Sequence, residues 1–230
     1  LTDSPNDGAT NLERSSSRYR FVIGALVLLA HIVVGLNVLA PSPLMPLIID
    51  EYTINRSTAG LLVSIPLLVT AGFGLPGGVL VSQLGLRMTF TIGWSLVGLV
   101  ALSAVAPNFG TLLTIYLAKG VGISLIMTAT GPLLMQWFKP REILVVNGLN
   151  TAGISLGLAL SVFTAAPLAG VLGWLPALTV FGFVGAVGVV VWLPLSKPVS
   201  GAVPLIPIAS PQDLWSILSN RAVLLLVIAD

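Results

Sequence analysis

The chain has 230 residues, of which 56% are hydrophobic and 8% are charged. Soluble domains carry about 25% charged residues, so this composition excludes an ordinary soluble globular domain. The formal net charge of +2 is too small to indicate a nucleic-acid partner. Cysteine is absent and His31 is the single histidine, which excludes disulfides, thiolate metal centres and any site that needs two histidines. We therefore expect no bound metal or cofactor.

A polar segment comes first and long apolar runs follow it. Residues 1–20 are rich in Ser, Asp, Asn and Arg and are expected to form a disordered tail. Ser57 or Thr58 is expected to cap the start of the second helix. Because about 20 apolar residues make a helix long enough to cross a bilayer, the runs predict an all-α polytopic membrane protein with six spans, at about 21–44, 58–81, 88–106, 111–137, 144–169 and 175–195.

A connector and the beginning of another apolar run end the chain. Residues 21–195 make up the predicted six-span bundle, and residues 196–221 form a connector rich in Pro and Ser. Residues 222–230, which are apolar up to Ala229 and end at Asp230, are too few to span a bilayer. We therefore expect the sequence to be a fragment that stops inside its seventh span.

The basic residues indicate which ends of the spans face the cytoplasm. Once six spans are counted, the basic residues of the tail, of the gaps at Arg87 and 139–141, and of the connector lie on one side. Only Arg56 lies on the opposite side. Because cytoplasmic loops of membrane proteins carry an excess of Lys and Arg, we expect a multi-pass protein of the plasma (inner) membrane with a cytoplasmic N-terminus.

Small residues recur at spacings that let helix backbones approach closely in lipid. Three of the predicted spans carry such a series, and at each we expect tight helix packing rather than a ligand site. The series are Gly74 and Gly78 in the second span, Gly153, Gly157 and Ser161 in the fifth, and Gly182, Gly185 and Gly188 in the sixth.

The turn after the second span has a distinctive sequence, Gly78-Val79-Leu80-Val81-Ser82-Gln83-Leu84-Gly85-Leu86-Arg87. It resembles the loop between helices two and three of the major facilitator superfamily, whose pattern is G-x-L-a-D-R-x-G-R-[RK]. Ser82 stands at the acidic position and Gln83 at the first basic position, so the charge contacts that hold the family's inward-closed state are absent or lie elsewhere in the protein. The resemblance implies a conformational-gating loop that includes Gly78, Ser82, Gln83, Gly85 and Arg87. Gly85 is suited to end a helix, and Arg87 to bind helix-end carbonyls or anionic headgroups.

Two later segments strengthen this resemblance. Residues 116–122 are similar to the family pattern R-x-x-Q-G-x-G, with Tyr116 in place of Arg and Lys119 in place of Gln. Residues 136–142 resemble the family turn W-F-x-x-x-E. The fifth span lacks the antiporter pattern G-P-x-x-G-G, of which 166–170 is a partial echo. Together the motifs cover about residues 20–195, and they loosely resemble the branch that contains cyanate and nitrate/nitrite porters.

The resemblance carries expectations about the whole protein. Family members have twelve spans in two six-helix bundles, and substrate binds between the bundles near the midplane. This chain would be the N-terminal bundle. Its expected partners are a small-molecule substrate, a coupling ion for which a proton is the candidate, the lipid bilayer, and a C-terminal half of the same chain.

Lys119 is the one charged residue inside an apolar run. A lysine at the bilayer centre costs about 2.5–3.5 kcal/mol on insertion scales, and such residues usually face a cavity or a partner. We interpret it as an anion-binding charge or a proton-coupled group; a structural pair or a snorkelling side chain is the alternative. No acidic residue of the predicted spans is placed to pair with it, which favours a substrate, a water-filled cavity or a partner in the missing half.

Other polar residues lie at membrane depth. Five residues of the fifth span, from Asn147 to Ser161, are expected to share one face that lines a cavity or bonds neighbouring helices. His31 has the chemistry to carry a proton but more often such a residue is packed and satisfied. The candidate substrate-binding or coupling residues are Lys119, Asn150, Thr151, His31, Asn37, Tyr116 and Ser155.

The leading hypothesis is a secondary active transporter that moves a small solute, such as an organic or inorganic anion, by alternating access. The alternatives are a drug or metabolite efflux antiporter and a transport-inactive receptor or subunit with the same bundle. No nucleotide-binding motif is present. Residues 153–157 match G-x-S-x-G, but a nucleophile elbow needs a strand, a turn and a histidine partner, so an enzyme is not expected.

Overall fold

The computed structural model describes residues 18–196 and shows them almost entirely as helices. Residues 1–17 of the predicted tail, residues 197–221 of the predicted connector and the predicted seventh run 222–230 lie outside the described residues. The end of the predicted tail is helical, because α2 begins at Tyr19. No strand occurs between residues 18 and 196, so the all-α prediction is confirmed. The elements are α2 (Tyr19–Leu39), η1 (Ser42–Leu44), α3 (Met45–Tyr52), α4 (Arg56–Gly72), α5 (Gly74–Gly98), η2 (Leu99–Val105), α6 (Phe109–Trp137), α7 (Pro140–Leu172) and α8 (Trp174–Leu195).

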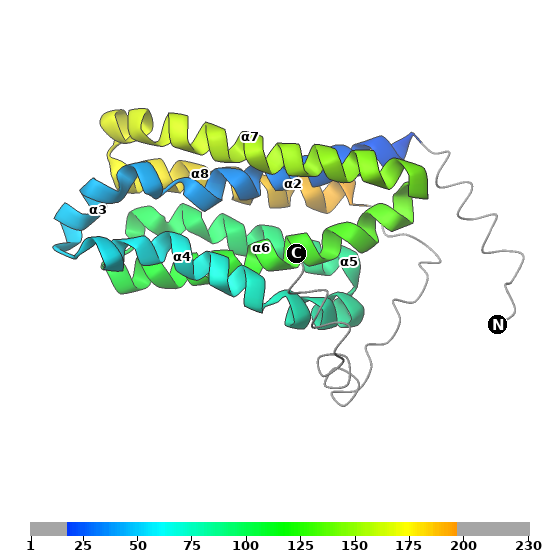
Figure 1. Ribbon diagram of the computed structural model, residues 1–230, viewed down its shortest axis with the longest axis horizontal. Coiled ribbons are helices and arrows are strands. Elements are labelled where there is room, and N and C mark those ends of the chain that lie inside the picture. Colours follow the sequence, from blue (N-terminus) through cyan, green and yellow to red (C-terminus); the bar gives the residue numbers. More distant parts are fainter. Residues whose placement is uncertain (1–17, 197–230) are drawn as a thin grey trace, which may run out of the picture.

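The described helices have the length and composition of membrane spans. Five stretches are long and apolar enough to cross a bilayer, and α4 is apolar but shorter, at 17 residues. Figure 1 shows α7, α2 and α8 along the upper part of the bundle and α4, α5 and α6 along the lower part. The chain is therefore an integral, multi-pass membrane protein.

The long helix α5 contains a reversal of the chain. Gly85 has φ 79° and ψ 163°, which breaks the helix between two arms, and glycine adopts positive φ without a Cβ clash. On the first arm Gly77 faces Thr128 of α6, whereas on the second arm Gly93 faces Ile126. Pro66 of α4 meets Gly120, so the contacts before the break move forward along α6 as the residue numbers rise. After the break Val97 meets Gly122, so the contacts move backward along α6. The two arms therefore pass α6 in opposite directions.

Six passes therefore cross the bundle, and aromatic side chains lie at both of its ends. At the end where α2 begins, Tyr19 Oη donates a hydrogen bond of 2.5 Å to the Leu195 carbonyl oxygen at the end of α8. At the opposite end the ring of Tyr52 lies edge-on to the rings of Phe109 and Trp174, with centroids 5.8 and 5.6 Å away. Aromatic residues of this kind are typical of the membrane–water interface.

The first pass is longer than predicted. We expected it to end near residue 44 and the second pass to begin near residue 58, but the helical path runs on through η1 and α3 to Tyr52. Proline is tolerated in the first turn of a helix, and Pro46 occupies that place in α3. The predicted cap was also wrong: Asn55, not Ser57 or Thr58, caps α4 by accepting a hydrogen bond from the Thr58 N–H.

The glycine series of the fifth and sixth spans make the close helix contacts that we predicted. A Cβ on Gly157 would meet the backbone of α2 at Ile32, and one on Gly182 would meet the backbone of η2 at Ala101. The prediction for the second span was wrong. Gly74 and Gly78 have no neighbouring atom within 4 Å of an added Cβ, because residue spacing alone does not say which side of a helix meets a neighbour.

Two apolar clusters fill the interior, one toward each end of the bundle. The cluster nearer the start of α2 contains Phe90, Trp94 and Trp192, and the other contains Tyr116 and Phe181. Several polar side chains are buried at middle depth, among them His31, Asn37, Lys119, Ser124, Asn150 and Ser161. This buried polar layer is where the candidate residues gather.

Candidate functional site

Lys119 is completely buried and is bound to α2. None of its surface is exposed, and Nζ donates a hydrogen bond of 2.9 Å to the backbone carbonyl oxygen of Asn37. Nζ also lies 3.9 Å from the centroid of the Tyr116 ring, one turn earlier on α6, where a cation is attracted to the face of the ring. The structure thus brings together three of the predicted residues, Lys119, Asn37 and Tyr116.

Asn37 joins three helices at this point. Its Nδ2 donates to the carbonyl oxygens of Val33 on α2, at 3.0 Å, and Phe181 on α8, at 3.2 Å. Its own carbonyl accepts from Lys119 on α6. Its Oδ1 and the Tyr116 hydroxyl are buried with no hydrogen-bond partner among the described residues. A buried polar atom without a hydrogen-bond partner destabilises the folded state, so these two oxygens are candidates to bind a ligand or a water molecule.

His31 is packed into α2 itself. The ring is buried, and Nδ1 donates to the Val27 carbonyl oxygen one turn earlier, at 2.8 Å. This is the satisfied packing arrangement that we weighed against proton transfer. None of the described hydrogen bonds joins His31 to Lys119 or to Asn37.

The polar residues of α7 do not share one face. Asn150 and Ser161 are buried, whereas Thr151 and Ser155 are exposed, and so is Asn147. Both amide atoms of Asn150 are buried without a partner among the described residues. The single stripe that we predicted is therefore wrong, because successive residues of a helix point about 100° apart.

Ser155 stands in the middle of an unbroken helix. The backbone of α7 is helical from Pro140 to Leu172, and Ser155 Oγ donates to the Thr151 carbonyl oxygen at 3.2 Å. Thr151 Oγ1 likewise donates to the Asn147 carbonyl oxygen, at 3.1 Å. Such backbone bonds within a helix are common for Ser and Thr. The strand–turn–helix geometry of a nucleophile elbow is not present around Ser155.

The predicted gating loop is attached to the end of α8. Arg87 Nε donates to Ser196 Oγ at 2.9 Å, and Nη2 donates to the Leu193 carbonyl oxygen at 2.8 Å. Of the two partners expected for Arg87, the helix-end carbonyl is thus present. The Ser82 hydroxyl, at the acidic position of the family pattern, donates to the Val79 carbonyl oxygen of its own helix, while Gln83 is exposed.

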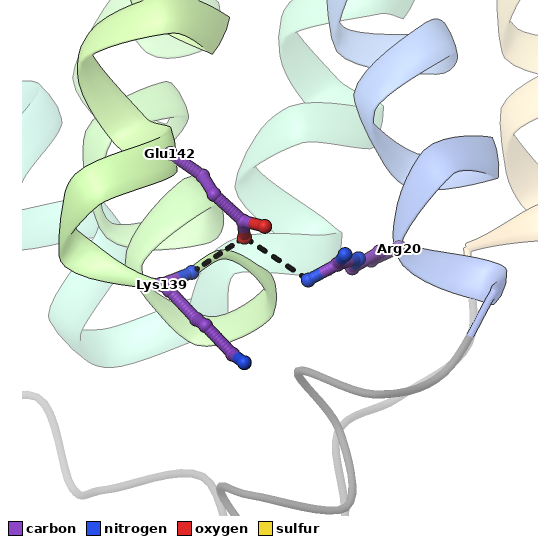
Figure 2. Close-up of polar contacts among 3 residues, drawn as sticks. All are labelled: Arg20, Lys139 and Glu142. Carbon is purple, nitrogen blue, oxygen red and sulfur yellow. Dashed lines mark hydrogen bonds and ion pairs between the residues drawn. The ribbon is translucent and has the colours of Figure 1, made fainter.

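A second tie at this end was missed from the sequence. Arg20 at the start of α2 forms an ion pair of 3.0 Å with Glu142 at the start of α7, the only ion pair between residues 18 and 196. Figure 2 shows the same Glu142 oxygen accepting from the Lys139 backbone N–H, at 3.1 Å. A glutamate at the third position of a helix often accepts a hydrogen bond from the backbone N–H at the helix start. This pattern in the sequence would have predicted the contact between Glu142 and Lys139.

No group of three or more His, Asp or Glu side chains within residues 18–196 is arranged to hold a metal ion. The buried polar layer offers hydroxyl, amide and amine groups, and it places no carboxylate against Lys119. Such a layer is suited to bind or attract an uncharged or anionic molecule.

The family model of the Major Facilitator Superfamily matches residues 27–229. The chain belongs to this superfamily. The matched region contains the reversal at Gly85, the Glu142 cap and all of the six-pass bundle except the first two turns of α2. The resemblance on which the sequence analysis rested is therefore confirmed.

Curated superfamily relatives are similar along most of this chain. It is 28% identical to an uncharacterized MFS-type transporter, YceJ, of Bacillus subtilis, over 84% of this chain and 50% of that protein. It is 27% identical to the hexuronate transporter of the same organism, over 79% of this chain and 43% of the relative. It is 25% identical to the probable nitrate transporter NarT of Staphylococcus carnosus, over 75% and 44%. The chain thus spans about half the length of the curated relatives it matches.

Proposed function

We propose that this chain is the N-terminal bundle of a secondary active transporter that moves a small anion across a membrane by alternating access. The observation that carries the proposal is the superfamily match over residues 27–229. Two of the relatives are named for the transport of hexuronate and nitrate, both of which are anions. A C-terminal half of the same chain would complete the site between two bundles.

Lys119 supports an anionic substrate. Its Cα lies about 6 Å from the middle of α6 along the helix axis, at 1.5 Å per residue. In its protonated form it places a positive charge in a bundle interior that holds no described counter-charge beside it. Because the side chain is completely buried, we propose that it attracts the anion through its electric field rather than by contact.

Thr151 and Ser155 on the exposed face of α7 are the residues that we propose for contact with substrate. Each hydroxyl donates its proton to its own helix in this structure, and it would turn that O–H toward an anion in order to bind it. We propose that three residues of the buried layer bind substrate through bridging water: Asn150, Asn37 and Tyr116. We propose that His31 has a packing role alone.

The orientation and the energy source are also proposals. Arg20, Arg87 and Lys139 lie at one end of the bundle, which favours a cytoplasmic N-terminus in a plasma (inner) membrane. A proton is the proposed coupling ion. The gating loop from Gly78 to Arg87 would govern opening toward the cytoplasm, with Arg87 as its fixed point on α8.

One observation favours a second candidate. Ser82 bonds its own helix and carries no charge, so the loop lacks the group through which the family holds its inward-closed state. A transport-inactive receptor or subunit with the same bundle would have no need of that group. An efflux antiporter is a weaker alternative, because residues 166–170 match the antiporter pattern only in part.

Uptake into proteoliposomes by the purified full-length protein tests these candidates, with nitrate, hexuronate and 4-hydroxybenzoate as probes. We expect uptake or counterflow of one of these anions, and a rise in KM of about tenfold for Thr151→Val and Ser155→Ala. Thr164→Val is the control, because Thr164 lies on the opposite face of α7 and bonds its own helix in the same way. Absence of counterflow with all probes would refute anion transport and favour the receptor.

A further inference from the structure

The path from α2 into η1 contains a carbonyl group that its own helix does not satisfy. In an α-helix each carbonyl oxygen accepts from the N–H four residues later. Four residues after Asn37 the chain has Pro41, which carries no N–H and whose ring pushes the carbonyl aside. The Asn37 carbonyl is therefore left without its helical donor in a buried position.

The same problem arises one turn later and is solved within the chain. Pro46 deprives Ser42 of its helical donor, but the Met45 N–H donates to the Ser42 carbonyl oxygen instead. That local solution uses the tighter hydrogen bonding of a 3-10 turn. At Asn37 the replacement donor comes from another helix: it is Lys119 Nζ, at 2.9 Å.

We infer that Lys119 is a positioning residue that supplies the hydrogen bond withheld by Pro41 and so fixes the break at the end of α2 to α6. The geometry fits this role in two further ways. The Asn37 carbonyl lies in the last turn of α2, where the negative end of the helix dipole favours a cation. The face of the Tyr116 ring also lies against the amine.

The break thereby becomes a junction of three helices. The Asn37 carbonyl is held by α6, and the Asn37 amide holds the Phe181 carbonyl oxygen of α8. The direction in which η1 and α3 leave α2 depends on this junction. Pro41 removes the helical donor of the Asn37 carbonyl, and Lys119 replaces it, so the hydrogen bond from Lys119 is needed only because Pro41 is present. A residue that only contacts substrate would show no such dependence on Pro41.

A double-mutant cycle with the full-length protein tests the dependence. Lys119→Met keeps the length of the side chain but removes the donor, which strands a buried carbonyl. We expect the thermal midpoint in detergent to fall by about 4–10 °C, from the usual cost of an unsatisfied buried acceptor and the usual shift per kcal/mol. Pro41→Ala restores a backbone N–H, so in that background Lys119→Met should lower the midpoint by less than half as much.

Pro46→Ala is the matched control, because the Ser42 carbonyl already has a donor. In the Pro46→Ala background, Lys119→Met should lower the thermal midpoint by as much as it does in the wild type. If Lys119→Met alone yields no folded protein, Pro41→Ala should recover it and Pro46→Ala should not. Equal losses in all three backgrounds, or recovery by both proline variants, would overturn the inference. Because the cycle reads stability, a wild type that transports none of the anions would refute the proposed function and leave this inference standing.

Discussion

The contact between α2 and α7 provides the sharpest test of the packing. At Gly157 an added Cβ would collide with the Ile32 carbonyl oxygen and lie 2.7 Å from the Leu36 nitrogen and 3.0 Å from the Gly35 Cα. All three are backbone atoms, so no side-chain rotation can relieve the clash. Overpacking of a rigid site costs up to about 3 kcal/mol, and alanine in place of a helical glycine returns about 1 kcal/mol. Gly157→Ala should therefore destabilise the bundle by about 2 kcal/mol.

The measurement is the thermal midpoint of the purified full-length protein in detergent. A loss of about 2 kcal/mol corresponds to a fall of about 4–8 °C for a bundle of this size. Gly148→Ala, two turns earlier on the same helix, is the control: no atom lies within 4 Å of its added Cβ, so the midpoint should stay or rise by about 2 °C. If the two variants shift the midpoint equally, the close approach of α2 and α7 is wrong.

Two further predictions concern the end of the bundle where α2 begins. Glu142→Gln should remove the ion pair with Arg20 and lower the thermal midpoint by about 1–3 °C at low salt, since pairs this exposed contribute under about 1 kcal/mol. The difference from the wild type should vanish in 1 M salt. The control is Glu51→Gln, at an exposed position, which should leave the midpoint unchanged. Arg87→Met should speed hydrogen exchange in the last turn of α8 roughly tenfold, as expected for about 1.4 kcal/mol lost with the bond to the Leu193 carbonyl, and an unchanged exchange rate there would contradict it.

Much of the fold is predictable because the bilayer imposes the length and polarity of each pass. The reversal at Gly85 was also predictable, since few residues other than glycine adopt its backbone angles. The ends of the helices were not. We expected the first pass to end near residue 44, but it continues past Pro41 and Pro46 to Tyr52, because proline stops a helix in its interior but not in its first turn.

The candidate site was harder to predict, because its partners are backbone atoms. Lys119 stands out in the sequence by its charge, and no acidic residue of the predicted spans is placed to pair with it. In the structure its Nζ instead donates a hydrogen bond to the Asn37 carbonyl oxygen. The signal was present in the position of Pro41, four residues after Asn37. On α7 the error had a different cause: Asn150 and Thr151 are neighbours in sequence, but one points into the bundle and the other out of it.

The way α7 is buried has a consequence for how this protein can vary. The helix is fully buried only along a narrow line of residues, most of them small, and much of its remaining surface is exposed. Mutations on that free surface should accumulate with little loss of folded protein, so α7 can acquire a new preference for ligands without first gaining stability elsewhere. The residues that such divergence must leave unchanged are Asn150, Gly153, Gly157, Ser161, Ala165 and Ala169.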